Sequence, residues 1–180
     1  MTLYLIKFLF FFSYMSWVNN KGHLKVTTGV VPKNILNRDA SLHDVRIECK
    51  GPDDKVFDRD AAIRAKVARG NCILETDGPD GKEYDFLVFA LRKFTGGLGD
   101  EDDVDRGKNE WRKYFLTDIE KAKFVVGTQK ANGEAAHLSC RWDNGSFLVC
   151  CGSKNVHLLF RQRGTSRDKN LKNSSNSKFT

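Results

Sequence analysis

Short apolar runs separated by turn-forming residues dominate the pattern of the chain. Between residues 25 and 56 the runs are interrupted by Pro32, Asn37, Gly51 and Pro52. Short runs bounded by Pro, Gly and Asn are typical of strands, because an amphipathic helix needs a longer stretch with a period of about 3.6 residues. This part of the chain is therefore predicted to consist of strands joined by turns.

Two later pairs of apolar runs flank polar turns, and each pair predicts a β-hairpin. In the first, residues 72–75 and 84–91 are joined through the segment DGPDGK; in the second, residues 134–142 and 146–151 are joined through an Asp-Asn-Gly turn. Asp-Gly and Asn-Gly steps favour the tight turns that connect antiparallel strands. Side chains alternate across a strand, so three residues of the second hairpin are expected on one face: Leu138, Cys140 and Trp142.

Helical signals are confined to two segments. Residues 58–70 contain four alanines, begin with Asp58 or Asp60 as an N-cap, and end at Arg69-Gly70, where the glycine is a stop signal. The second segment has aromatic residues at helical spacing, which more often mark a core stripe than a ligand platform: Trp111, Tyr114 and Phe115.

Downstream of these aromatic residues, Thr117 and Glu120 form a capping-box pattern that predicts a further helical turn. The apolar run at residues 124–128 then predicts a strand leading into Lys130. Taken together, the elements predict an α+β fold, with an antiparallel-rich mixed sheet and flanking helices. The 180 residues suffice for one domain with a sizeable core, which is predicted over residues 25–160.

The first 24 residues contain an apolar run from Phe8 to Val18. The run has the length of a signal-peptide apolar region and is short for a membrane span. No basic residue precedes Lys7, and no small-residue cleavage site follows the run. A buried helix or strand, or a segment foreign to the fold, is therefore favoured over secretion or membrane anchoring.

The net charge of +7 depends largely on the end of the sequence, because residues 161–180 hold six of the 30 basic residues and one acid. Few apolar residues there could offset the entropy lost on ordering, so a basic disordered tail is predicted. Such a tail is either solubilising or loosely attracted to polyanions.

The five cysteines form an odd set with no CxxC pair and no histidine at zinc-finger spacing. They indicate reduced thiols rather than a disulfide framework or a zinc site, which favours a cytoplasmic or nuclear location. The acids from Asp100 to Asp105 also fail to match a calcium loop, since glycine at the sixth position and glutamate at the twelfth are missing. No metal-ligating residue is predicted from the sequence.

The chain lacks a GxxxxGK[ST] loop, an HExxH, a GxSxG and a dinucleotide fingerprint, which leaves the segment KANGE at residues 130–134 as candidate chemistry. Gly133 permits a close backbone approach, and Asn132 tolerates a turn. The amine of Lys130 could attack phosphorus only when unprotonated, so its reference pKa of about 10.4 would have to be lowered by burial or by a second cation. The pattern alone is common, and three further features surround it.

Arg69-Gly70 precedes a predicted hairpin, residues 92–94 (RKF) follow it, and residues 152–155 (GSKN) end the strand after the last hairpin. With these elements in this order, the chain resembles the covalent nucleotidyltransferases, specifically the bacteriophage-type RNA ligases and the fungal and plant tRNA-splicing ligases. The resemblance covers Val26 to about Leu159. It implies a partial nucleotidyltransferase domain of the ATP-grasp-like ligase kind.

The resemblance implies that Lys130 takes AMP covalently, that Arg69 and Lys93 face the phosphates of ATP, and that Lys154 touches the nucleotide. With ATP and Mg²⁺ as cofactors, the implied activity seals RNA 5′-phosphate to 3′-hydroxyl ends, as in RNA repair or tRNA splicing. The full set of residues implied to bind the nucleotide is Arg69, Lys93, Asn132, Gly133 and Lys154. His137 is expected to be a packed or solvent-facing strand residue rather than a base.

The resembling ligases continue with an acidic strand, a Glu-Gly element and a terminal Lys-x-Lys pair, and none of these appears here. The chain is therefore expected to be a truncated first half with weak or no activity alone, and a second chain supplying the missing elements is a candidate partner. One alternative is a non-catalytic nucleotide- or RNA-binding module derived from the same fold. Another is a secreted or membrane-associated protein in which the Lys130 pattern is coincidental, although no stable membrane association is expected.

Overall fold

The computed structural model describes residues 2–79, 81–94, 110–129, 131 and 133–162. These residues form an α+β structure with two separate antiparallel sheets and few helices. The expectation of a single mixed sheet is therefore wrong, because every pair of neighbouring strands is antiparallel and the last three strands form a sheet of their own.

The first sheet has the strand order β1-β2-β3-β4 and the second the order β5-β6-β7, so within each sheet every strand pairs with its neighbour in sequence. The strands of the first sheet are β1 (Leu24–Val30), β2 (Ala40–Ile47), β3 (Asn71–Gly78) and β4 (Gly81–Phe89). The strands of the second sheet are β5 (His137–Asp143), β6 (Ser146–Gly152) and β7 (His157–Arg161). Both predicted hairpins are confirmed as β3–β4 and β5–β6, and the predicted strands in residues 25–56 correspond to β1 and β2.

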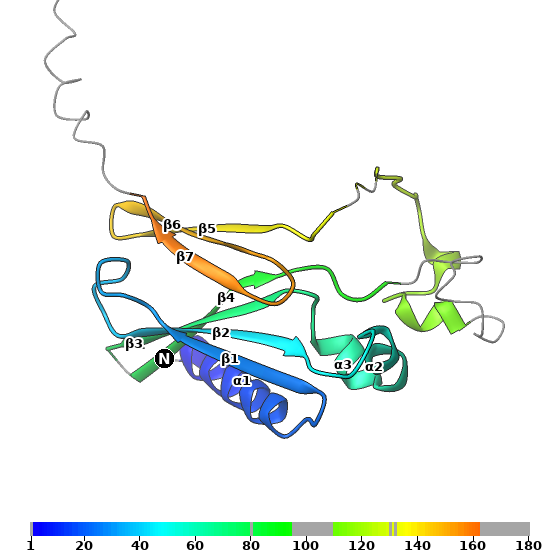
Figure 1. Cartoon of the computed structure of the whole chain (residues 1–180), viewed down its shortest axis with the longest axis horizontal. Coiled ribbons are helices and arrows are strands. Elements are labelled where there is room, and N and C mark those ends of the chain that lie inside the picture. Colours follow the sequence, from blue (N-terminus) through cyan, green and yellow to red (C-terminus); the bar gives the residue numbers. More distant parts are fainter. Residues whose placement is uncertain (1, 80, 95–109, 130, 132, 163–180) are drawn as a thin grey trace, which may run out of the picture.

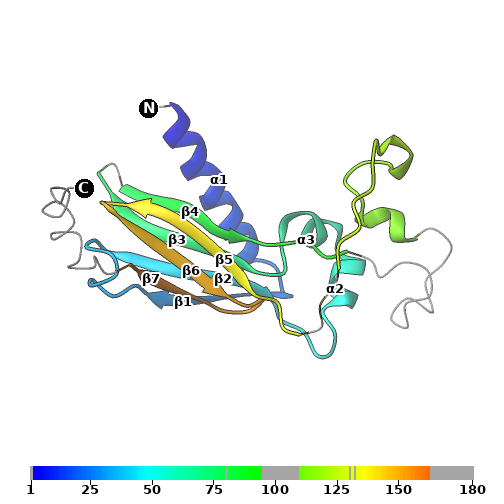
Figure 2. The ribbon, with the colours of Figure 1, turned by 90° about the horizontal axis from the view of Figure 1, so that it is seen from above.

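The first sheet is covered on both faces, as Figures 1 and 2 show: α1 (Thr2–Asn19) lies against one face, and the second sheet lies over the other. Two apolar cores fill these interfaces. The core beneath α1 contains Phe11, Tyr14, Val18, Val45, Val56, Phe57, Ile63, Val67 and Ile73. The core between the sheets contains Val31, Leu36, Ala40, Cys72, Leu74, Leu87, Val88, Leu148 and Cys150.

The apolar amino-terminal segment forms α1, one side of which is buried against the sheet. The ring of Phe11 stacks on Tyr84 and packs against Phe86, while Tyr14 makes an edge contact with Phe86. The Tyr14 hydroxyl accepts a hydrogen bond of 2.6 Å from the Asn71 side-chain amide. Within the described part of the chain, no helix has both the length and the apolar character that a membrane crossing requires.

The single helix expected over residues 58–70 is two short helices, α2 (Asp54–Arg59) and α3 (Ala61–Lys66). Asp60 separates them because its backbone is extended and its carboxylate accepts hydrogen bonds from the first turn of α3. α3 ends at Lys66 rather than at Gly70, since Ala68 already pairs with Arg92 in a β-bridge.

In the sequence between β4 and β5, two short 3₁₀ helices occur at η2 (Glu110–Tyr114) and η3 (Ile119–Lys121). The predicted capping box is wrong: η3 begins after Asp118 and has no side-chain cap. The strand predicted at residues 124–128 is also wrong, because this segment has no strand partner and its apolar side chains are exposed. An apolar run becomes a strand only when a neighbouring edge accepts its hydrogen bonds.

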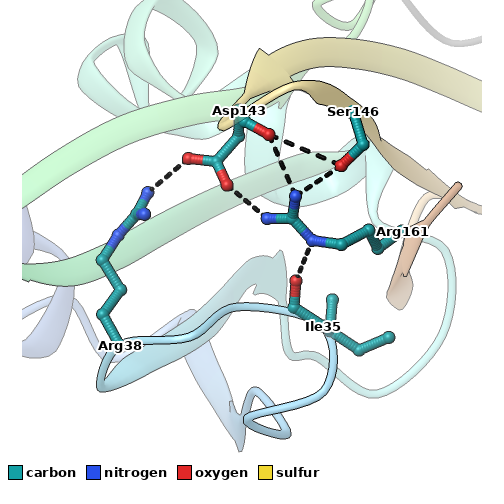
Figure 3. A network of polar contacts seen from close by, with 5 residues as sticks. All are labelled: Ile35, Arg38, Asp143, Ser146 and Arg161. Atoms are coloured by element: carbon teal, nitrogen blue, oxygen red, sulfur yellow. Dashed lines mark hydrogen bonds and ion pairs between the residues drawn. The ribbon is translucent and has the colours of Figure 1, made fainter. Parts of the chain in front are cut away.

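Arg161, expected to begin a disordered tail, instead ends β7 and is held by several hydrogen bonds (Figure 3). Its guanidinium donates to the Ile35 carbonyl at 2.5 Å, to the Asp143 carbonyl at 2.9 Å and to Ser146 Oγ at 2.5 Å, and it pairs with the Asp143 carboxylate. Arg38 binds the other oxygen of that carboxylate at 3.0 Å. The network ties the β1–β2 loop to the β5–β6 turn; residues 163–180 of the expected tail lie outside the described residues.

Candidate phosphate-binding site

Three basic side chains from distant parts of the sequence meet at two adjacent carboxylates. Arg69 Nη2 lies 3.1 Å from Asp53 Oδ1, and Lys154 Nζ lies 3.8 Å from Asp53 Oδ2. Lys93 forms an ion pair with Asp54. These are the three cations that the resemblance to RNA ligases implied for nucleotide binding, and the carboxylates bring them into one cluster, which we call the cation cluster.

Backbone pairing explains how Arg69 and Lys93 come together. Residues 68–70 run antiparallel to residues 90–92: Ala68 and Arg92 form a bridge, the Arg69 amide donates to the Leu91 carbonyl at 3.0 Å, and the Ala90 amide donates to the Gly70 carbonyl at 2.9 Å. This short ladder extends the β3–β4 hairpin beyond its regular strands. It places the Arg-Gly and Lys-Phe elements side by side.

Lys154 reaches the cluster from the turn between β6 and β7. The turn is tight, since the Ser153 amide donates to the Val156 carbonyl at 2.9 Å, and a Cβ on Gly152 would lie 2.1 Å from that same oxygen. A side chain at Gly152 would therefore force the turn apart. Gly152 therefore allows the turn that brings Lys154 of the second sheet close to Asp53 at the start of α2.

Asp53 and Asp54 were not among the site residues predicted from the sequence. They occupy the N-cap and first residue of α2, and the Asp53 side chain makes no cap hydrogen bond. Burial raises the pKa of Asp54, but the hydrogen bond and charge of Lys93 and the charge of Arg69 outweigh burial and lower that pKa below its usual value. The available signal was the adjacent acid pair after the turn former Pro52, in a segment otherwise read as strand and turn.

A cavity of about 870 Å³ adjoins the cation cluster and lies between the ends of β4 and the start of β5. Both Arg69 and Lys154 line it, together with the apolar side chains of Leu91 and Phe94. A cavity with an apolar wall and cations at one side suits a ligand that has a flat apolar part and an anionic part.

The segment that contains Lys130 contributes to this cavity. Ala131, Gly133 and Glu134 are among its lining residues, whereas Lys130 and Asn132 lie outside the described residues. Gly133 has a φ of +137°, a conformation that side-chain-bearing residues rarely adopt. This conformation favours glycine, but the close approach expected at Gly133 is not found among the described residues, because an added Cβ would have no neighbour within 4 Å.

The cation cluster has a hydrogen-bond donor available for an anionic ligand. The Nε–H of Arg69 is buried and has no acceptor among the described residues, so this side chain holds a donor beyond those paired with Asp53. The three cations and two carboxylates sum to a formal charge of +1. Because a nucleoside triphosphate carries about four negative charges, it would need Mg²⁺ as well as this cluster. The carboxylate oxygens of Asp53 and Asp54 are ligands of the type that Mg²⁺ prefers.

His137 lies on the cavity wall, half-buried, with its ring packed over Gly70, where an added Cβ would be 2.0 Å from His137 Cε1. Its Nδ1 lies 3.1 Å from the Ser153 carbonyl oxygen and 3.2 Å from His157 Nε2. Burial, followed by the neighbouring His157, lowers the pKa of His137. The ring is therefore held in place by the start of β7, as expected for a packed strand residue.

Comparison of the chain with protein-family models, with curated proteins and with solved structures finds no match.

Proposed function

We propose that this chain is the nucleotide-binding first half of an ATP-dependent RNA ligase, with Lys130 as the residue that takes AMP. The observation that carries the proposal is the cation cluster. Arg69, Lys93 and Lys154 come from three separate segments, and their ion pairs gather them around Asp53 and Asp54. Arg69 and Lys154 line the cavity, and so does Ala131, which follows Lys130 in the chain.

In this proposal the cations bind the phosphates of ATP by exchanging a carboxylate partner for a phosphate oxygen. Arg69 has the donor geometry for a two-point contact, while the lysines act as point charges. Mg²⁺ would supply the remaining positive charge, with Asp53 and Asp54 as its nearest oxygen ligands among the described residues of the cluster.

The proposed chemistry begins with the unprotonated amine of Lys130. A nitrogen–phosphorus bond forms at the α-phosphate, and the bond to pyrophosphate breaks, so pyrophosphate leaves with the electron pair. The attacking nitrogen gives up a proton to solvent. An oxygen of an RNA 5′-phosphate then attacks the same phosphorus and the nitrogen–phosphorus bond breaks, and finally an RNA 3′-hydroxyl loses its proton, attacks the RNA 5′-phosphate and releases AMP. Nearby cations lower the pKa of an amine, which is the effect the cation cluster would contribute.

The outer face of the second sheet supports the expectation of a further partner. Leu138, Trp142 and Leu158 are 73%, 66% and 60% exposed there, next to Phe147 and Phe160. The shared face predicted for Leu138, Cys140 and Trp142 is thus the uncovered one. We propose that a polypeptide carrying the remaining ligase elements covers this surface.

The cysteines of the described residues are free thiols, and we propose on this basis that the protein is cytoplasmic or nuclear.

The proposal is tested by incubating the full chain with α-labelled ATP and Mg²⁺, followed by denaturation. Label retained on the wild type but absent from Lys130→Ala supports it, even if the yield is small, as expected for a first half acting alone. The matched control is Lys123→Ala, an exposed lysine away from the cavity lining. Equal labelling of the wild type and Lys130→Ala would refute the assignment.

ATP binding is a second readout that does not require catalysis. Arg69→Ala and Lys154→Ala should each weaken binding about 10- to 100-fold, the effect of losing one charge-assisted contact. ATP binding that depends on both residues without any covalent label would favour the alternative, a non-catalytic nucleotide- or RNA-binding module. Binding unaffected by either change would show that the cation cluster is not a phosphate site.

A further inference from the structure

Four potential metal ligands are buried together between the two sheets. The first sheet contributes Asp44 from β2 and Cys72 from β3, and the second contributes Cys150 from β6 and His157 from β7. All four are buried, and both cysteines belong to the apolar core between the sheets. This position is separate from the cation cluster, to which none of the four contributes an ion pair.

The side chains already contact one another. His157 Nδ1 lies 2.7 Å from Asp44 Oδ1, and the His157 amide donates to Asp44 Oδ2 at 3.0 Å. One ligand atom from each of Asp44, Cys72 and His157 lies within 4.8 Å of the others. The Cys72 thiol also hydrogen-bonds to the Cys150 thiol, so the fourth group adjoins the cluster through Cys72.

Burial of such a set requires a physical reason. A carboxylate and an imidazole stand where leucine and valine fill the rest of the interface, and burying such polar groups is costly unless each is matched by a partner, whereas a thiol alone is often buried as a small apolar group. The hydrogen bond to His157 matches Asp44, but it gives no reason for two thiols from opposite sheets to converge on the same pair. A shared cation would use all four groups at once.

We propose that Asp44, Cys72, Cys150 and His157 bind one Zn²⁺-type divalent ion that joins the two sheets. Two thiolates, one imidazole and one carboxylate form a four-ligand set suited to tetrahedral Zn²⁺. The protein supplies all four positions and the site is buried, so the ion would be structural rather than catalytic. The ligands are scattered through the sequence, which is why the cysteine spacing gave no sign of a site.

Binding of the ion would change the protonation of both cysteines and fix the tautomer of His157. Cys72 and Cys150 would each release a thiol proton to solvent and bind as thiolates. If His157 binds through Nδ1, its remaining proton sits on Nε2, which lies 3.2 Å from His137 Nδ1. A ligating histidine commonly donates its other N–H to a neighbouring acceptor, so His137 would orient the His157 ring by accepting through an unprotonated Nδ1, which then no longer donates to the Ser153 carbonyl.

The test uses the full chain, purified with a thiol reductant and stripped of metal with a chelator. Zn²⁺ is titrated against a competing chromophoric chelator, and Co²⁺ is used to reveal thiolate-to-metal charge-transfer absorption. We expect one ion per chain and a rise in thermal stability on Zn²⁺ addition. The Cys72→Ala and Cys150→Ala variants should each bind at least about 100-fold more weakly and lose thiolate absorption.

The matched control is Cys140→Ala, which removes an exposed thiol on the outer face of β5 and should bind Zn²⁺ like the wild type. His137→Asn should cost about tenfold in affinity, since it removes the contact to His157 and leaves the four ligands in place. Folding of the variants is checked by circular dichroism. A folded, reduced wild type that binds no stoichiometric Zn²⁺, or Co²⁺ absorption that survives both cysteine replacements, would overturn the proposal.

Discussion

Replacement of Arg161 by leucine should destabilise the fold far more than replacement of a surface arginine. The change removes three hydrogen bonds, to Ile35, Asp143 and Ser146, together with the Asp143 ion pair (Figure 3). Hydrogen bonds to charged groups contribute about 1.5–3 kcal/mol each, but contributions within one network are not additive. Because the Arg161 side chain is 20% exposed, solvent reduces the total, and we expect a loss of about 2–4 kcal/mol.

The assay is urea unfolding of the full chain at neutral pH, followed by circular dichroism. Arg112→Leu is the matched control, because Arg112 and Glu120 form an ion pair whose side chains are 48% and 58% exposed. Exposed pairs contribute about 0–1 kcal/mol, so this control should change the free energy of unfolding little. If the two variants differ by less than about 0.5 kcal/mol, the network does not stabilise the fold as argued.

The pH dependence of the same variant provides an independent check. Burial raises the pKa of Asp143, but Arg161 and Arg38 outweigh it and lower that pKa below its usual 3.8. A carboxyl group with a lowered folded pKa stabilises the fold fully above its unfolded value, and this stability is lost as the pH falls through the folded value. The difference between wild type and Arg161→Leu should therefore be constant down to about pH 5 and shrink below it.

Three further changes test the cores and the packing around the cavity. Phe57→Ala, at a side chain with no exposure, should lower the free energy of unfolding by about 3–5 kcal/mol in urea; a loss below about 1 kcal/mol would contradict its core position. Gly70→Ala, at φ +113°, should cost at least about 1 kcal/mol and shift the NMR signals of His137, and unchanged spectra would argue against the close packing. Burial raises the pKa of Tyr14 to about 12, with the Asn71 hydrogen bond opposing it, so the free energy of unfolding should fall as the pH rises above 10.0. Below about pH 11, the ultraviolet titration curves of wild type and Tyr14→Phe should be identical, because Tyr14 is not yet ionised. Loss of an ionisation near pH 10 in the variant would refute the burial of Tyr14.

Local signals determined the hairpins. The turn between β5 and β6 consists of Asn144 and Gly145, whose φ values of +46° and +82° are the positive pair that a two-residue hairpin turn requires. Neighbouring residues alone specify such a turn, and the alternation of Leu138, Cys140 and Trp142 follows from the same short-range geometry. Asp60 was one of the two cap residues predicted, and the order of the Arg69, Lys93 and Lys154 elements was likewise read along the chain.

Short-range sequence signals could not predict which strands and charged side chains from distant parts of the chain come into contact. Nothing local separates the run at residues 124–128, which stays exposed, from β7, which finds β6 as a neighbour. The division into two sheets and the capture of Arg161 by Asp143 depend on which strand edges and carboxylates arrive nearby.

The sequence by itself therefore determined which segments turn and pair with their immediate neighbours, because backbone conformation and side-chain alternation are short-range properties. Only the tertiary structure decided that Asp53 and Asp54 gather the three cations, and that Asp44, Cys72, Cys150 and His157 meet between the sheets. The physical reason is that burial and charge pairing depend on distance in space, and stacking one sheet on another brings together residues that lie far apart along the chain.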